Sequence, residues 1–204
     1  MLYHSTMELK IIERAIMKRI LMAAVMLAGL SLSAASYQAK IMINGISDGV
    51  KMTKGACSAG GSVSNATWLK DGNNEKIIIA SFPAEREWKK GEFSFTPEKD
   101  GKIYLQLLSW AADDKGKVMN GWVLIDDITL AGIAFENGNF DNEDSSSWRL
   151  KVMPDFKAEI VEGAGRDSSN AVKISYGCPA DYAKPIMARA GQAINVSYWY
   201  KIAP

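Results

Sequence analysis

The sequence predicts an all-β protein built as a two-layer β-sandwich or jelly roll, and three observations predict this fold. After residue 36 there is no convincing amphipathic helix. Short segments of alternating apolar and polar residues recur instead, and Gly, Asn, Asp and Pro separate them. Strands at this spacing, without helices between them, are typical of sandwiches and jelly rolls.

Strands are expected wherever this alternation is sustained between turn residues. The expected strands are 39–44, 49–54, 62–69, 75–82, 91–96, 102–109, 121–130, 133–136, 157–162, 170–176, 184–189 and 193–201. Successive residues of a strand point to opposite faces of its sheet. In the strand around 102–110, an apolar face of Ile103, Leu105 and Leu107 is therefore backed by Tyr104, Gln106, Leu108 and Trp110. In 193–201, Ile194, Val196, Tyr198 and Tyr200 are likewise backed by Asn195, Ser197, Trp199 and Lys201.

Residues 1–35 are expected to be an N-terminal extension followed by a signal helix of the Sec type. Lys18-Arg19 precede an apolar run from Ile20 to Leu32, and Ser33-Ala34-Ala35 supplies small residues for cleavage. The run is roughly 13 residues long, short of the ~20 that a spanning helix needs. We therefore expect a secreted, cell-surface or periplasmic protein with no stable membrane span after cleavage. An uncleaved membrane anchor is the alternative.

Composition excludes several functional classes. The net charge is +1 and no polybasic block is present, so nothing points to nucleic acid, and a neutral ligand fits this balance. The only histidine, His4, precedes the expected signal. Ser-His-Asp catalysis, Cys-His catalysis and histidine-ligated metals are thereby excluded from the mature chain. Catalysis by a carboxylate pair, as in glycoside hydrolysis, stays open.

The two cysteines, Cys57 and Cys178, allow a single disulfide pairing. Export would permit such a bond. The sequence does not show whether the two Cα atoms come within bridging distance. Two buried free thiols are the alternative.

Several stretches resemble the galactose-binding-like jelly-roll modules of polysaccharide-degrading enzymes, which bind cellulose or xylan. Stretches 68–73 (WLKDGN) and 88–97 (WKKGEFSFTP) resemble the later strands of such modules, and 123–130 (VLIDDITL) resembles the final strand. Stretch 135–141 (FENGNFD), with Trp148 following, resembles the opening, and 190–201 (AGQAINVSYWYK) resembles a central strand. The resemblance implies a jelly-roll fold and a polysaccharide or oligosaccharide partner.

The order of these stretches departs from the family, because residues 37–133 resemble a C-terminal half and residues 134–204 an N-terminal half. The chain could be a fragment of a tandem array, or a domain at 37–133 followed by a truncated module. It could also be one circularly permuted sandwich joined through Ala131-Gly132. Half a sandwich would expose an apolar face and open strand edges, which favours the permuted sandwich.

Aromatic and amide side chains are the ligand-binding candidates, because a flat ring stacks on the apolar face of a sugar while amides bind its hydroxyls. Trp88 and Trp148 match positions at which the family usually has packing residues. The candidates on the mixed faces are Trp199, Trp110, Tyr104 and Gln106, and Trp122 could belong to either class. The alternative is that these faces pack beneath a loop or a second layer.

The resemblance also implies a structural Ca²⁺ held near the opening turn and the final acidic pair. The matching residues are Asp126, Asp127 and Asp141, although the family commonly has Glu at the last position. Calcium takes several carboxylate and carbonyl oxygens. Strict alternation would place Asp126 and Asp127 on opposite faces, so at most one would point inward. A solvated surface pair is the alternative.

These features together predict an exported, non-catalytic carbohydrate-binding module. One alternative is a structural or adhesive surface module that binds a protein. The other is a fragment of a larger glycoside-hydrolase-associated protein with a carboxylate pair.

Overall fold

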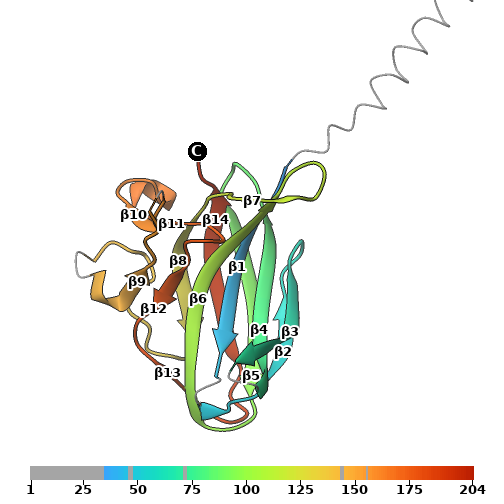
Figure 1. Cartoon of the computed structure of the whole chain (residues 1–204). Coiled ribbons are helices and arrows are strands. Elements are labelled where there is room, and N and C mark those ends of the chain that lie inside the picture. The colour runs from blue at the N-terminus through green and yellow to red at the C-terminus, as the bar shows by residue number, and fades with distance from the viewer. Residues whose placement is uncertain (1–34, 46–47, 71–72, 143–144, 155) are drawn as a thin grey trace, which may run out of the picture. The chain divides into compact units, whose positions relative to one another are not determined.

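The computed structural model describes residues 35–45, 48–70, 73–142, 145–154 and 156–204, and this part of the chain is all-β (Figure 1). For residues 67–70, 73–76 and 145 the description is of the backbone alone. Residues 1–34, which include nearly all of the expected extension and signal, lie outside the described residues, as does part of the stretch 68–73. The all-β prediction is confirmed.

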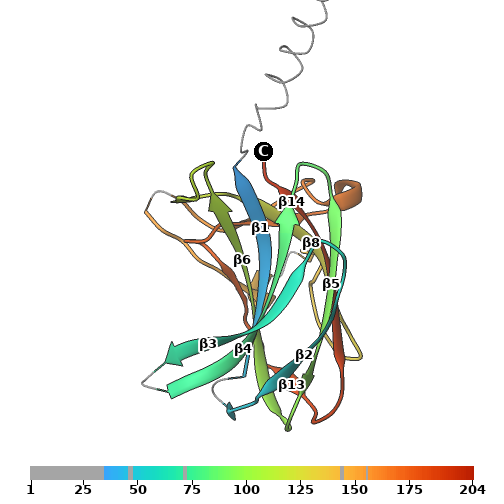
Figure 2. The same ribbon diagram turned by 90° about the vertical axis from the view of Figure 1, so that its right-hand side faces the viewer.

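Two antiparallel sheets form the sandwich, here called the β6 sheet and the β14 sheet (Figure 2). The β6 sheet has the order β3 (Ser62–Lys70), β4 (Asn73–Ala84), β1 (Ser36–Asn44), β6 (Gly101–Ala112), β12 (Ala180–Tyr182) and β9 (Trp148–Leu150). Two further short strands, β7 (Val118–Met119) and β13 (Ile186–Ala188), also pair with β6. The β14 sheet has the order β10 (Glu159–Val161), β11 (Ala171–Ile174), β8 (Val123–Ala131), β14 (Ile194–Ile202), β5 (Lys89–Pro97) and β2 (Met52–Cys57).

Each half of the sequence contributes strands to both sheets. In the β6 sheet, β6 lies between β1 from the first half and β12 from the second. In the β14 sheet, β14 from the second half lies between β8 and β5 from the first. Residues 35–133 and 134–204 therefore build a common core.

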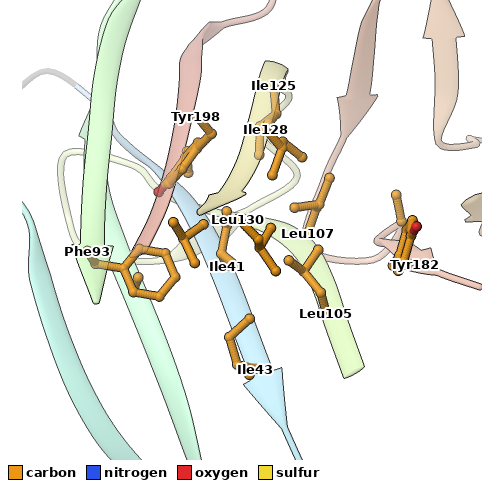
Figure 3. Packing of buried hydrophobic residues seen from close by; sticks show 14 of the residues in the cluster. Ile41, Ile43, Phe93, Leu105, Leu107, Ile125, Ile128, Leu130, Tyr182 and Tyr198 are labelled. Carbon is orange, nitrogen blue, oxygen red and sulfur yellow. The ribbon is translucent and has the colours of Figure 1, made fainter. Parts of the chain in front are cut away.

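The core lies between the two sheets and is formed by the alternating apolar side chains (Figure 3). Ile41 of β1 and Leu107 of β6 face Leu130 of β8 and Tyr198 of β14, and all are at most 4% exposed. At about 25 cal/mol per Å² of apolar surface removed from water, such side chains each contribute roughly 1.5–3 kcal/mol. Burial of these inner faces leaves the opposite faces of both sheets for other roles.

The expected alternation is confirmed in the two strands that carry the ligand-binding candidates. Ile103, Leu105 and Leu107 are buried in β6, whereas the intervening side chains are half-buried. In β14 the inward side chains are buried and the outward ones are exposed or half-buried. Tyr104, Trp110 and Trp199 therefore all lie outside the core.

The expected strand at 133–136 is wrong. After Gly132, with φ +84°, the chain turns back beside β8 without forming a ladder. One bond from the Ile128 N–H to the Gly138 carbonyl (2.8 Å) ties it there, and the Trp148 indole donates to the Asn137 carbonyl (2.9 Å). Positive φ at Asn137 (52°) and Phe140 (58°) curls this segment away from extended geometry.

Within the described residues, the structure contains no helix with the length and apolar character that crossing a membrane requires.

Tyr198 places a polar hydroxyl group inside the core. Its ring packs edge-on against Phe82, with 5.6 Å between the centroids, and lies 5.5 Å from the ring of Tyr200. Its buried hydroxyl has no hydrogen-bond partner among the described residues. Burial raises the pKa of this hydroxyl well above its usual value. An unpaired buried hydroxyl costs stability because it gives up its bonds to water.

We predict that Tyr198→Phe leaves the free energy of unfolding unchanged or raises it by about 1 kcal/mol, because it removes an unsatisfied group. Tyr182→Phe is the matched control, since the Tyr182 hydroxyl accepts a bond from the Glu136 N–H (3.1 Å). This control should cost about 1 kcal/mol. Urea unfolding measures both values. A loss in Tyr198→Phe as large as that in Tyr182→Phe would contradict the assignment.

Candidate ligand-binding faces

The predicted ligand-binding residues divide between the two sheets. Tyr104, Gln106 and Trp110 lie on β6, with their side chains on the outer face of the β6 sheet. Trp199 lies on the outer face of the β14 sheet, and Trp122 immediately precedes β8. The structure therefore brings three of these residues onto one face and keeps Trp199 on the opposite side of the sandwich.

Strand β1 adds polar side chains to the outer face of the β6 sheet. Antiparallel pairing places Gln38 opposite Trp110 and Asn44 opposite Tyr104. Between them lies Lys40, whose Nζ is 5.1 Å from the centroid of the Trp110 ring. Burial lowers the pKa of the Lys40 ammonium. This face thus combines rings, amides and a partly desolvated cation.

Strands β12 and β9 extend this face with charged groups. Asp181 pairs with Gln106 across the strands, and the Gln106 amide donates to its Oδ1 at 2.6 Å. Arg149 of β9 is the next residue in this row and donates to the Ala183 carbonyl at 3.0 Å. A row of polar side chains therefore crosses β6, β12 and β9.

The sequence did not single out Tyr176, which completes this face. The expected strand 170–176 ends at Ile174, and Tyr176 lies in the connection from β11 to β12. Its ring meets the ring of Trp110 edge-on, with 5.0 Å between centroids. Among the aromatic side chains that the structure describes, Tyr176 is the most exposed, at 54%. Only long-range pairing of β12 with β6 places it there, although the turn-rich run Ser-Tyr-Gly-Cys-Pro marks a loop.

Trp199 is covered by a cation. The Arg166 guanidinium carbon lies 4.6 Å from the centroid of the Trp199 ring. Ion pairs to Asp127 (3.2 Å) and Asp167 (3.1 Å) hold this guanidinium in place. A sugar stacking on this side of the ring would have to displace Arg166. Cation–π contacts of this kind contribute about 0.5–1 kcal/mol at exposed sites.

Trp122 is also engaged with the protein. Its ring packs edge-on against Phe156 (6.3 Å between centroids) and against the core. Lys173 Nζ lies 5.4 Å from its ring centroid.

An open groove of about 490 Å³ crosses the outer face of the β14 sheet. Its lining is mostly small or polar, and Thr129 and Ser197 share a hydrogen bond across it (2.8 Å between hydroxyl oxygens). The residues that line it are Ala56, Cys57, Ser58, Glu92, Phe93, Ser94, Thr129, Ala131, Asn195, Val196 and Ser197. None of the lining residues except Phe93 is aromatic, and its ring is buried in the core. The groove thus lacks an exposed ring for stacking.

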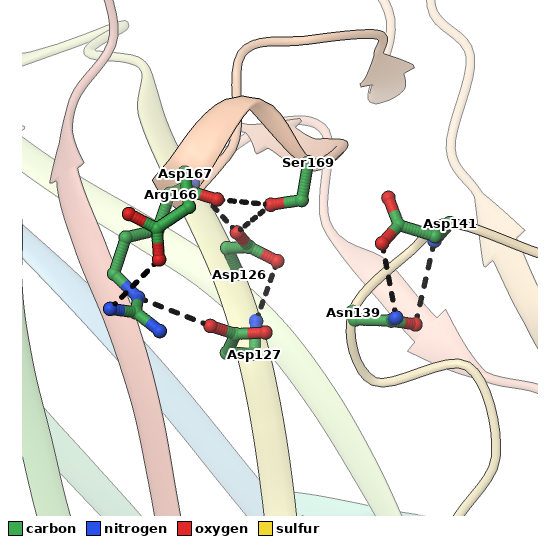
Figure 4. Close-up of polar contacts among 7 residues, drawn as sticks. All are labelled: Asp126, Asp127, Asn139, Asp141, Arg166, Asp167 and Ser169. Carbon is green, nitrogen blue, oxygen red and sulfur yellow. Dashed lines mark hydrogen bonds and ion pairs between the residues drawn. The ribbon is translucent and has the colours of Figure 1, made fainter.

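Asp126 is buried on the outer side of the β14 sheet beneath the turn that carries Arg166 (Figure 4). Its Oδ2 accepts bonds from the Arg166 N–H and the Ser169 hydroxyl, both 2.8 Å long. Its Oδ1 accepts the Asp127 N–H at 2.7 Å. Burial raises the pKa of Asp126, and these three donors act against that rise.

Two backbone features make room for this carboxylate. Asp127 has a φ of +50° at a shift in the pairing of β8 with β14, so the alternation expected for the acidic pair is interrupted. Gly165 lies directly over Asp126, where an added Cβ would come within 2.7 Å of Oδ2. Asp126 therefore lies outside the core yet remains buried.

The third predicted metal ligand lies apart from the other two (Figure 4). Asp141 accepts the Asn170 N–H (2.8 Å) and the Asn139 amide (3.1 Å). Across the described residues, no three Asp, Glu, His or Cys side chains are grouped as a metal ion would require. Both oxygens of Asp126 accept protein donors in this structure. Calcium at this site stays a prediction.

The two cysteines are both free thiols in this structure, with Cys57 exposed and Cys178 buried. Cys178 Sγ lies 3.4 Å from the Phe156 carbonyl oxygen, to which it donates. The cross-link that two cysteines would allow is therefore not part of the described fold.

No protein-family model, curated protein or solved structure matches the chain. Its function is therefore inferred from the geometry of these two faces.

We predict that Asp126 makes stability fall as pH rises. Its pKa is raised in the native state, so the unfolded chain releases this proton at a lower pH than the native chain. The contribution of Asp126 to the free energy of unfolding is fully present below the ordinary Asp pKa of about 3.9. It is lost as pH rises through the higher pKa of the native state. The unfolding free energy of the wild type minus that of Asp126→Asn should thus be more positive at acid pH than at neutral pH.

Denaturant unfolding across this pH range measures the difference. Asp167→Asn is the control, because the Asp167 side chain is 77% exposed and its substitution should cost little. A difference that grows as pH rises would show that hydrogen bonding, and not burial, dominates at Asp126.

Proposed function

We propose that this chain is an exported, non-catalytic carbohydrate-binding protein, and that it binds a polysaccharide or oligosaccharide on the outer face of the β6 sheet. The observation that carries the proposal is the Tyr176–Trp110 pair, in which an exposed ring is held edge-on by a second ring. A ring fixed in this way is ordered before the ligand arrives. Binding then loses less side-chain entropy than it would with a freely rotating ring.

The polar groups around this pair support a sugar ligand. Sugars present apolar C–H faces and a rim of hydroxyls, so their sites combine a stacking ring with a few placed donors and acceptors. Gln38 lies across the strands from Trp110, and the linked Gln106 and Asp181 lie farther along the same face. The Asp181 carboxylate, with about four acceptor positions, has room for hydroxyl donors besides the Gln106 amide.

The proposal is one of binding without catalysis. The sole histidine, His4, precedes the expected export signal. On the proposed face Asp181 is the one carboxylate among the described residues of β1, β6, β12 and β9 whose side chain points outward. A single carboxylate does not supply the pair of acids that glycoside hydrolysis uses.

We predict that Tyr176→Ala abolishes retardation of the protein in affinity electrophoresis through soluble glucans, xylans and mannans. The loss follows from removal of the exposed stacking ring, which contributes about 1–3 kcal/mol to such contacts by burial of its apolar surface. Because Tyr176 is about half-exposed and its ring packs edge-on against Trp110, the substitution should lower the unfolding free energy by no more than about 1.5 kcal/mol.

Trp199→Ala is the matched control on the opposite sheet and should keep the retardation. Loss of retardation in Trp199→Ala but not in Tyr176→Ala would move the site to the β14 sheet. Retardation by none of the glycans would favour the adhesive surface module, and release of reducing sugar would favour an enzyme.

A further inference from the structure

Lys40 lies within the proposed binding face without a carboxylate partner. It belongs to β1 and is flanked by Ser81 of β4 and Leu108 of β6. The aromatic ring of Trp110 is its cation–π partner, at 5.1 Å. Among the described residues, no Asp or Glu oxygen lies within 4.0 Å of its Nζ.

The other charged groups of this face do not neutralise Lys40. Asp181 is two strands away, on β12, and its carboxylate accepts the Gln106 amide. Arg149, next to Asp181 on β9, adds a second positive charge. The described outer face of β1, β6, β12 and β9 therefore holds three cations, Lys40, Lys102 and Arg149, and one carboxylate, with Lys40 on the side where Trp110 and Tyr176 meet.

Lys40 is half-buried in this face, so water only partly solvates its ammonium group, and this burial lowers its pKa. A partly desolvated charge gains more from an opposite charge than a fully exposed one, because the surrounding dielectric is lower. The cation–π contact with Trp110 compensates only part of the lost hydration, at about 0.5–2 kcal/mol. A ligand anion is the partner that would compensate the rest.

We infer that this face binds an acidic saccharide, whose carboxylate or sulfate pairs with Lys40 while a sugar ring stacks on Tyr176. This inference rests on the proposed function and narrows its ligand class. The near-neutral charge of the whole chain does not reveal it, because the preference arises from one lysine placed among rings. The shared chemistry is a fixed anionic group on a sugar.

The β14 sheet offers a comparison that shows what is particular to Lys40. Lys173 also lies near a tryptophan ring, that of Trp122 (5.4 Å). Its cross-strand neighbour, however, is Glu159, so a carboxylate lies on the adjacent strand. Lys173→Met is therefore the matched control for Lys40→Met, since each replaces a lysine beside a tryptophan with an apolar side chain of similar length.

The test is isothermal titration of the full chain with three oligosaccharides of equal length. The probes are an oligogalacturonate (carboxylate), a sulfated galactan oligosaccharide (sulfate) and a neutral β-1,4-glucan. At low salt at least one acidic probe should bind about tenfold or more tightly than the neutral one, and added salt should reduce that advantage. Whichever acidic probe binds more tightly identifies the anion.

Lys40→Met should reduce acidic binding to the neutral level, whereas Lys173→Met should leave it unchanged. Lys40→Gln gives a second, polar variant if Lys40→Met fails to fold. Equal affinity of the wild type for acidic and neutral probes, or acidic binding that survives both Lys40 variants, overturns the acidic preference and leaves the proposed function intact. Binding of no probe by the wild type overturns both.

Discussion

The pairing of β6 with β1 on one side and β12 on the other is the interaction on which the rest of the structure depends. Strands β1 and β6 come from the first half of the sequence, and β12 comes from the second. This pairing joins strands from both halves of the sequence into one sheet. The inward side chains of that sheet, among them Leu105 and Leu107, are buried in the core. The pairing also assembles the proposed binding face, which takes Trp110 from β6 and Tyr176 from the connection that leads into β12.

The two outer faces differ in a way that bears on function. On the β14 sheet, Arg166 lies over Trp199 and is fixed by Asp127 and Asp167, so the protein itself occupies that side of the ring. On the β6 sheet, Trp110 holds Tyr176 edge-on, and about half of the Tyr176 surface stays exposed. A tryptophan is therefore covered by an arginine on the β14 sheet, whereas a tryptophan supports an exposed tyrosine on the β6 sheet.

Sequence patterns predicted the long strands reliably. They did not predict the three-residue strands, the bulge in β8 or the contacts between segments far apart in the sequence. The twelve residues of β6 and nine of β14 are long enough for a period of two to show. β9 and β12, with three residues each, are too short to show it. The bulge at Asp127 breaks the alternation that would have placed Asp126, and the positions of Tyr176 and Arg166 follow from contacts between distant segments.

Separate expression of residues 35–133 and 134–204 tests the shared core most directly. Neither fragment alone should show a cooperative thermal transition, because residues 35–133 would leave one side of β6 unpaired and residues 134–204 would leave both sides of β14 unpaired, with the inner apolar faces in water. Mixing them in equal amounts should restore a β-sheet circular dichroism spectrum and a single transition. A cooperative transition in residues 35–133 alone, unchanged when the second fragment is added, would contradict the account.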